Sequence, residues 1–419
     1  MRKCSWVYHA LNAIYSLIKN YSRRNFYFVV LVANLYGITF GIFLPILCNG
    51  FIYSKYFFPG LSNDEIEKKV VHVNDRRVKA AEIYLDFKNK NESLDYYRSV
   101  QDLNMTDLTI AVVTVKRTSD HKLNYLTQVV TKLDFLIHSD LSMGRKAMFI
   151  CNTEAGPGKH EEAERLSKYF LSKMRFPKSD PAASIMDKFE KEKEDYIYCL
   201  AKALEFKSKY IVIIEDDTVP TDNMLTVLQY LVESYMEKKT YHGDWITNSQ
   251  QWAFLKLYYP ERWQGYAFEF KRIIELFSFG TIGGSGFVFL YHLLSKSVQR
   301  CYLISFVLGA VYMILVVLLI GRQHIIQWKT WSKYTYDVIA APDCCTPAIL
   351  YERSMAERLI QHLNATVCDN NYPIDYAMDK FAKDNKYSKY LVEPNIFKHI
   401  GMFSSIKRKS KHPKNFWFY

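Results

Sequence analysis

The chain has no acidic residue before Asn25, and from Asn25 to Ser54 it has no charged residue of either sign. This uncharged run is rich in Phe, Val, Leu and Ile, and it exceeds the roughly 20 residues that a membrane-spanning helix needs. The run also lacks a small-residue cleavage site, which excludes a removed signal peptide and predicts a retained anchor. Because only basic charges precede it, the N-terminus is expected to face the cytosol.

The sequence also lacks a basic and aromatic module of the kind that binds nucleic acid, although its formal net charge is +12. This absence, together with entry into the secretory pathway, excludes a nucleic-acid partner. We interpret the positive excess as solvated surface, with attraction to phosphate-bearing ligands or membrane surfaces as the alternative. A chain of 419 residues can form one large catalytic domain beside its membrane segments.

Two further apolar runs, Leu276–Leu294 and Cys301–Ile320, lack charge, and Lys296 and Arg300 lie between them. This pattern predicts a transmembrane helical hairpin with a basic cytosolic turn, and a pair of buried core helices is the alternative. The predicted organisation is a cytosolic tail over 1–25, a transmembrane helix over 26–53, a lumenal stem over 54–107, a first catalytic part over 108–273, the hairpin over 274–320, and a second catalytic part with a basic tail over 321–419.

Glycosylation sequons begin at Asn91, Asn104 and Asn364. The first two follow the first predicted span, and the third follows the last. Two crossings lie between them, so all three sequons fall on the same side of the membrane. The sequons and the charge rule therefore agree on a lumenal catalytic domain.

Cysteines are few, with eight in the chain. Five of them are expected in the lumen, where disulfides form, and because five is odd at least one should stay unpaired. A bond between the adjacent Cys344 and Cys345 is disfavoured by geometry, which makes a bridge from one of them to Cys368 the plausible alternative. The five lumenal cysteines are Cys151, Cys199, Cys344, Cys345 and Cys368.

Apolar runs of strand length alternate with helical stretches after residue 107. Leu108–Val115, Lys146–Asn152 and Tyr210–Ile214 are predicted strands, whereas Asn124–His138 and Glu190–Phe206 are predicted helices. This alternation predicts an α/β fold with a mostly parallel sheet. Ligands of such sheets bind at the carboxyl ends of the strands.

The third predicted strand ends in three consecutive acidic residues, Glu215, Asp216 and Asp217. Three carboxylates at the tip of a buried strand are costly unless a divalent cation and a nucleotide diphosphate neutralise them. The motif is similar to the Asp-x-Asp sites of GT-A glycosyltransferases. We therefore expect Mn²⁺ or another divalent cation on Glu215 and Asp217, nucleotide contacts from Asp216 and Asp217, and catalytic roles for Glu215 and Asp216. An acidic loop that caps the helix near Thr221 is the alternative.

Thr114, Lys116 and Arg117 lie at the end of the first strand, where a GT-A fold holds the nucleoside and the phosphates. They are predicted to bind the donor nucleotide, and solvated basic side chains at the start of a loop are the alternative. Asn152, at the tip of the next strand, is a further candidate.

Three C-terminal motifs carry a more specific signal: Ala341–Tyr351, Asp375–Asp379 and Val392–Ser405. With the Glu-Asp-Asp motif and the three predicted spans, they resemble the post-GPI-attachment factor four family, from the first span to about Ser405. The resemblance implies a multi-pass Golgi enzyme whose GT-A-like domain is split by the hairpin. It implies transfer of N-acetylgalactosamine from UDP-GalNAc to the first mannose of GPI anchors, with GPI-anchored proteins as acceptors. The oligomeric state stays open.

The family forms a β-linkage from an α-linked donor, so the resemblance implies inversion, which requires a general base. Asp375 is the candidate base, with Asp379 as the competitor and a helix N-terminal charge as the structural alternative. His399 follows a predicted strand at Tyr390–Glu393 and is the candidate third metal ligand. A structural histidine in a turn is the alternative there.

Two other functions remain open at the level of sequence. A Golgi N-acetylglucosaminyltransferase that branches N-glycans would share the sheet and the acidic site, but such enzymes normally carry one span. A non-catalytic membrane adaptor or lipid-binding protein would tolerate neutralisation of the three consecutive carboxylates.

Overall fold

The computed structural model describes residues 26–57, 62–88, 92–102, 106–117, 123–178, 187–237, 251–294, 302–404 and 409–410. The chain divides into two compact units. The membrane unit contains the chain up to Ser62 and Glu261–Trp328, and the sheet unit contains Asn63–Pro260 and the chain from Lys329 onward. The predicted cytosolic tail, the basic hairpin turn, most of the basic C-terminal tail and the sequons at Asn91 and Asn104 lie outside the described residues.

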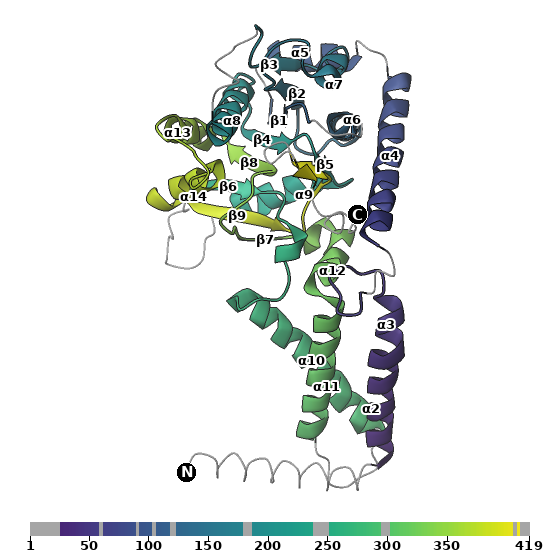
Figure 1. Ribbon diagram of the computed structural model, residues 1–419. Helices are drawn as coiled ribbons and strands as arrows, with labels where there is room; N and C mark the ends of the chain where they lie inside the picture. The colour runs from purple at the N-terminus through teal and green to yellow at the C-terminus, as the bar shows by residue number, and fades with distance from the viewer. Residues whose placement is uncertain are drawn as a thin grey trace. The chain divides into compact units, whose positions relative to one another are not determined.

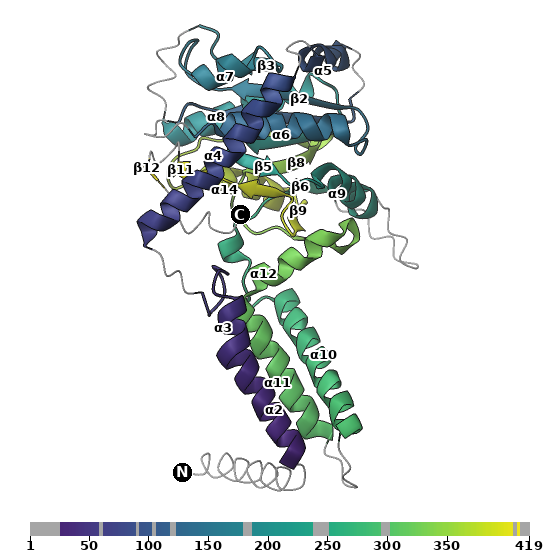
Figure 2. The same ribbon diagram turned by 90° about the vertical axis from the view of Figure 1, so that its right-hand side faces the viewer.

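The membrane unit contains three helical segments that are long and apolar enough to cross a membrane: Phe26–Leu47, Phe270–Leu294 and Tyr302–Ile320. The first consists of α2 (Phe26–Ile38), the π-helical turn η1 (Thr39–Phe43) and α3 (Leu44–Leu47). The other two are α10 and α11, and Figure 2 shows both beside α2. Each predicted span is therefore a helix. The unit also contains η4 (Glu261–Trp263), α12 (Arg322–Gln327) and η5 (Trp328–Trp331), the last of which extends into the sheet unit.

Glycines allow α10 and α11 to approach each other closely. A Cβ atom added to Gly283 would lie 2.5 Å from the carbonyl oxygen of Gly309 and would overlap the Cβ of Met313. A Cβ added to Gly309 would lie 2.5 Å from the Cβ of Phe287. Small residues of this kind let helix backbones pack in lipid, where the hydrophobic effect adds little to association.

We predict that Gly283→Leu destabilises the membrane unit by about 1–3 kcal/mol, because the larger side chain cannot fit between the two helices. The measurement is thermal unfolding of the purified full chain in detergent. Gly286→Leu is the matched control, since no atom lies within 4 Å of a Cβ added at that position on the same helix. Equal melting temperatures for the two variants would show that the packing of α10 on α11 contributes nothing.

The sheet unit is built on a single sheet in the order β3-β2-β1-β4-β8-β6-β9-β7. β1 pairs in parallel with β2 and β4, whereas β8 and β7 run antiparallel to their neighbours. The fold is thus α/β with a mostly parallel sheet, as the sequence predicts. The strands are β1 (Leu108–Thr114), β2 (Lys146–Asn152), β3 (Ser172–Met174), β4 (Tyr210–Glu215), β6 (Trp252–Lys256), β7 (Asp337–Ala340), β8 (Ala348–Glu352) and β9 (Ser388–Glu393).

Strands from both sides of the hairpin join this sheet. β6 precedes α10 in the chain, and β8 and β9, its partners on either side, follow α11. The hairpin is therefore an insertion into one folded domain. β6, β7 and β8 were not predicted from the sequence.

Helices cover both faces of the sheet, with α8 and α13 on one face and α6 and α4 on the other (Figure 1). Each helix buries apolar side chains in the continuous core around β1, β2 and β4. The helices of this unit are α4 (Asn63–Phe87), α5 (Glu92–Asp102), α6 (Tyr125–Ser139), α7 (Glu161–Leu166), α8 (Lys188–Leu204), α9 (Met224–Leu231), α13 (Arg353–Asn364) and α14 (Ile374–Asp384).

The segment predicted as a stem contains α4 and α5, and both belong to the sheet unit and hydrogen-bond to α6. Tyr84 on α4 and Tyr97 on α5 donate hydrogen bonds of 2.6 and 2.7 Å to the buried carboxylate of Asp134 on α6. Burial raises the pKa of Asp134, but hydrogen bonds from His138, Lys88 and Tyr84 outweigh it and hold the pKa below its usual range. The ionised Asp134 carboxylate therefore holds α4 and α5 against α6.

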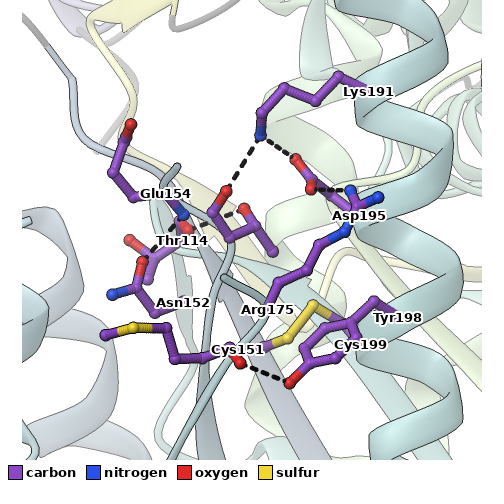
Figure 3. The surroundings of a disulfide bond; sticks show 11 residues. Thr114, Cys151, Asn152, Glu154, Arg175, Lys191, Asp195, Tyr198 and Cys199 are labelled. Atoms are coloured by element: carbon purple, nitrogen blue, oxygen red, sulfur yellow. Dashed lines mark hydrogen bonds and ion pairs between the residues drawn. A yellow bond between two sulfur atoms is a disulfide. The ribbon is translucent and has the colours of Figure 1, made fainter. Parts of the chain in front are cut away.

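One disulfide, Cys151–Cys199, joins the end of β2 to α8 (Figure 3), and a second joins Cys344 to Cys345. The expectation that the adjacent cysteines do not bond each other is wrong, and so is the alternative bridge to Cys368. Cys345 has φ of 72°, a turn that the sequence does not reveal. The backbone N–H of Cys368 is instead held 2.7 Å from Glu190, and its thiol is free, as expected for one lumenal cysteine.

Candidate metal and nucleotide site

The acidic motif lies at the carboxyl end of β4, in the middle of the sheet. The backbone N–H of Asp216 donates to the carbonyl of Val113 on β1 at 3.0 Å, which extends the β1–β4 ladder to this point. The chain then forms β5 (Thr218–Pro220), which pairs with β10 (Phe397–His399) so that Thr218 lies opposite His399. This ribbon brings the C-terminal part of the chain to the acidic motif.

Glu215, Asp217 and His399 each present one ligand atom, and the three atoms lie within 4.8 Å of one another. The Asp217 side chain is 1% exposed, and the Nε2 atom of His399 lies 3.4 Å from its Oδ2 atom. The ring of Tyr258 stacks on His399 at 5.8 Å between centroids and fixes the orientation of the imidazole. Two carboxylates and an imidazole form a donor set that suits a first-row divalent cation such as Mn²⁺. The predicted ligands therefore converge and fit a metal ion.

Arg117 supplies positive charge to this cluster from the end of β1. Its Nη1 atom lies 2.9 Å from Oδ2 of Asp217, and its Nε donates to Oδ1 of Asp216 at 3.1 Å. Burial lowers the pKa of the Arg117 guanidinium, but the carboxylates of Asp216, Asp217 and Glu215 outweigh burial and raise the pKa above its usual value. One permanent cation thus compensates part of the charge of the acidic motif.

Asp216 faces β1 and is not among the three clustered ligands. The Thr114 hydroxyl donates to Asp216 Oδ2 at 2.6 Å, and Nε2 of His160 lies 2.8 Å from the same hydroxyl oxygen. Because this hydroxyl has one hydrogen, His160 must donate its Nε2–H to Thr114. Burial lowers the pKa of His160, which favours this neutral form. Thr114 therefore positions Asp216, and Asp216 positions Arg117.

Lys116 and Asn152, the other strand-tip candidates, lie apart from the carboxylates. The Lys116 side chain is 47% exposed, and its Nζ lies 4.0 Å from Glu161. The backbone N–H of Lys116 donates to the Glu154 carboxylate at 3.0 Å. The Asn152 side chain accepts from the Glu154 backbone N–H at 3.0 Å (Figure 3). Glu154 thus joins the ends of β1 and β2. The side chain of Lys116 lies at the surface beside this junction.

Asp375, the candidate base, lies in the first turn of α14. Its Oδ2 accepts a 3.1 Å hydrogen bond from the backbone N–H of Cys345. Two residues later in the same loop, the carbonyl of Pro347 accepts a 2.9 Å bond from the backbone N–H of Glu215. The loop therefore links Asp375 to Glu215, one of the three clustered candidate ligands, through two backbone contacts.

Asp379, the competing base, is engaged elsewhere. Its Oδ1 accepts a 2.8 Å hydrogen bond from Lys389. Burial raises its pKa, and its Oδ2 has no hydrogen bond from any residue that the structure describes. One Asp379 oxygen thus pairs with Lys389 and the other is buried, which leaves Asp379 less accessible to a substrate than Asp375.

Gly401 lies against the side chains of Asp217 and His399. The backbone N–H of the preceding residue, Ile400, donates to the carbonyl of Asp217 at 2.8 Å. A Cβ atom at residue 401 would lie 2.6 Å from Cγ of Asp217 and 3.0 Å from Cε1 of His399. Gly401→Ala should displace both side chains and lower the rate of a reaction at this site about 100-fold, the cost of a misplacement of about 1 Å. Steady-state kinetics is the measurement. Gly286→Ala is the control, because the added methyl group meets no neighbour at that position. A Gly401→Ala enzyme with wild-type activity would be incompatible with this geometry.

His160 and Tyr258 carry no motif that the sequence could reveal, and Gly401 lies in the Val392–Ser405 motif but was not predicted as a site residue. His160 follows the Gly156–Gly158 loop, and Tyr258 and Gly401 lie far from the acidic motif in the chain. The loop after β2 brings His160 to the acidic motif, the end of β6 brings Tyr258, and the ribbon of β5 and β10 brings Gly401.

One known protein family matches the part of the chain that carries this site. The family model described as GPI-N-acetylgalactosamine transferase PGAP4 matches residues 108–398. The match begins at the first residue of β1 and ends one residue before His399, and it includes the acidic motif, the inserted hairpin and Asp375.

Proposed function

Because the chain belongs to the GPI-N-acetylgalactosamine transferase family, and is therefore a glycosyltransferase that acts on GPI anchors, we propose the following reaction. The enzyme transfers N-acetylgalactosamine from UDP-GalNAc to the first mannose of a protein-bound GPI anchor, with inversion of configuration. The observation that carries the proposal is the convergence of Glu215, Asp217 and His399 at the end of β4, within a chain that matches this family. The match also favours this function over branching of N-glycans.

On the donor side, Glu215, Asp217 and His399 hold a divalent cation. When bound, the cation supplies positive charge against the diphosphate of the leaving UDP. Arg117 keeps Asp216 and Asp217 in place through its two contacts, and its charge is already present before substrate binds. Such preorganised charge stabilises a developing anion without reorganisation during the reaction.

On the acceptor side, the mannose hydroxyl attacks the anomeric carbon from the face opposite the diphosphate. The bond from the hydroxyl oxygen to the sugar forms while the bond from the sugar to the diphosphate oxygen breaks, and UDP leaves with the electron pair. Asp375 takes the hydroxyl proton. The Cys345 N–H fixes one carboxylate oxygen of Asp375 and leaves the other for the substrate.

The proposed location is the Golgi membrane, with a cytosolic N-terminus and a lumenal sheet unit. Three helices of membrane-spanning length support the membrane location. The Cys151–Cys199 disulfide suits an oxidising lumen. Of the three sequons, Asn364 lies exposed at the end of α13, where a glycan would meet no core packing.

The test is transfer by the purified full chain with Mn²⁺ across a panel of UDP-sugars, using a GPI-anchored protein as acceptor. UDP-GalNAc should be the preferred donor, and the product should be lost when the GPI anchor is removed from the acceptor. Removal of Mn²⁺ with a chelator should abolish transfer, and added Mn²⁺ should restore it. Preference for another donor would reject the assigned sugar, and transfer to N-glycans would reject the assigned acceptor.

A further inference from the structure

Lys256, the last residue of β6, has a buried ammonium group at the edge of the sheet that carries the acidic motif. β6 and β4 each pair antiparallel with β8, so they run parallel to each other and end at the same edge. Lys256 is only 2% exposed. A lysine is rarely buried to this extent unless partners replace the water around its charge. The contacts of its ammonium group therefore indicate its role.

The ammonium group of Lys256 donates to two carbonyl groups of the loop between β7 and β8. One is the carbonyl of Pro342, at 2.9 Å, and the other is the carbonyl of Cys344. The carbonyl of Cys344 and the N–H of Cys345 belong to the same peptide group. This N–H donates to Oδ2 of Asp375 at 3.1 Å. A single peptide group thus lies between the cation of Lys256 and the carboxylate of the proposed base.

A covalent ring and two hydrogen bonds fix the orientation of the peptide group between Cys344 and Cys345. The disulfide between the two side chains closes the ring, and the backbone of Cys345 has φ of 72°. Hydrogen bonds at the oxygen and at the nitrogen of one peptide group polarise each other, and bonds to a charged group are the stronger ones. The cation of Lys256 therefore both orients and strengthens the N–H that holds Asp375.

Lys256 carries its charge near neutral pH. Burial lowers the pKa of its ammonium group to about 8, and the negative charges of Asp379, Asp375 and Asp343 act against burial. Lys389, which pairs with Asp343 and Asp379, adds to the lowering of this pKa. An ammonium group with a pKa of about 8 is mostly protonated at pH 7.

We propose that Lys256 is a positioning residue for the transfer reaction. Through the peptide group between Cys344 and Cys345, it holds the carboxylate of Asp375 in the orientation that takes the proton of the acceptor hydroxyl. Lys256 acts on the reaction through Asp375 and does not touch the substrate. The inference rests on the proposed function, in which Asp375 is the base, and extends it to the group that orients this base.

The test compares Lys256→Met with Lys146→Met in single-turnover transfer at saturating UDP-GalNAc and Mn²⁺. Lys146 is the matched control, because it is also buried and donates to three loop carbonyls at 2.7–3.0 Å. It is the first residue of β2 and therefore lies at the opposite edge of the sheet. Lys256→Met should react about 10- to 100-fold more slowly, since a misplacement of about 1 Å costs about 100-fold. Lys146→Met should transfer at the wild-type rate.

The donor side should be unaffected, so Lys256→Met should bind Mn²⁺ and UDP with wild-type affinity. Lys256→Arg keeps the charge and the N–H donors and should recover most of the lost rate. A wild-type rate in Lys256→Met, or a loss of rate that arises from weaker UDP binding, would overturn the proposal.

A double-mutant cycle separates positioning from a merely structural role. In the Asp375→Asn background, Lys256→Met should change the transfer rate by less than about twofold, because the group that Lys256 positions is already lost. Losses that multiply would show that Lys256 acts independently of Asp375 and would overturn the proposal.

Hydrogen exchange of residues 342–347, followed by mass spectrometry, tests the contact without the reaction. These residues should exchange faster in Lys256→Met, and at the wild-type rate in Lys146→Met and Lys256→Arg. Unchanged exchange in Lys256→Met would contradict the role of Lys256. If Lys256→Met does not fold, Lys256→Gln, whose neutral side chain is one bond shorter, gives the same comparison. A wild-type chain that does not transfer to GPI would reject the proposed function, while exchange of this loop would still report on Lys256.

Discussion

Asp217→Asn is expected to lower the transfer rate at least about 1000-fold, because the metal cluster loses its most buried carboxylate. Asp217 lies between His399 at 3.4 Å and Arg117 at 2.9 Å, so its charge holds both a proposed ligand and the permanent cation. Charge stabilisation by a bound metal contributes several kcal/mol, and about 4 kcal/mol corresponds to three orders of magnitude in rate. The amide of Asn keeps the shape of the side chain but supplies no charge.

Calorimetric titration of UDP in the presence of Mn²⁺ should locate this loss on the donor side. Wild-type protein should bind UDP only when Mn²⁺ is present. Asp217→Asn should bind neither Mn²⁺ nor UDP. Asp222→Asn is the control, since Asp222 is an exposed acid five residues later that pairs with Lys132 outside the cluster. Metal-dependent UDP binding retained in Asp217→Asn would mean that the cation lies elsewhere.

Asp375→Asn should leave Mn²⁺ and UDP binding intact and lower transfer about 100- to 10,000-fold, the range that a general base contributes. The Asn side chain can still accept the Cys345 N–H bond, so the loop that leads to Glu215 should keep its position. A loss of rate without a loss of donor binding would assign Asp375 to the acceptor side. The measurement combines single-turnover transfer with the same calorimetric titration.

Asp384→Asn is the matched control for this variant, because Asp384 lies on the same helix and its carboxylate pairs with Lys380 at the exposed end. It should transfer at the wild-type rate. A wild-type rate in Asp375→Asn would mean that another group takes the proton. A parallel loss in Asp384→Asn would indicate damage to α14.

The parts of the fold that local pattern determines were predictable from the sequence. β2 spans Lys146–Asn152 as predicted, and β1 and β4 differ from prediction by one residue, because fully buried parallel strands are continuous apolar runs. The three spans were predictable for a similar reason, since length and absence of charge suffice. β8, in contrast, pairs antiparallel to β4 across the inserted hairpin, a long-range contact that no local period encodes.

The candidate site divides in the same way. Three acidic residues after a buried strand predicted that Glu215–Asp217 belong to the site. The family resemblance predicted Asp375 and His399 as further site residues. Sequence could not show that Asp216 turns away from the clustered ligands, because that depends on the Thr114 hydroxyl and on His160, which belongs to a separate loop. The disulfide between Cys344 and Cys345 was missed because it depends on the turn at Cys345, which only the folded backbone reveals.

Glu215, Asp217 and His399 are proposed to hold a divalent cation together with the nucleotide. Pulsed electron paramagnetic resonance of Mn²⁺ and UDP on the full chain tests this claim most directly, because a coordinated imidazole couples its nitrogen to the metal. We predict a nitrogen coupling that shifts when the histidines are labelled with ¹⁵N and that disappears in His399→Ala. A bound Mn²⁺ with no histidine coupling, or a coupling unchanged in His399→Ala, would contradict the account.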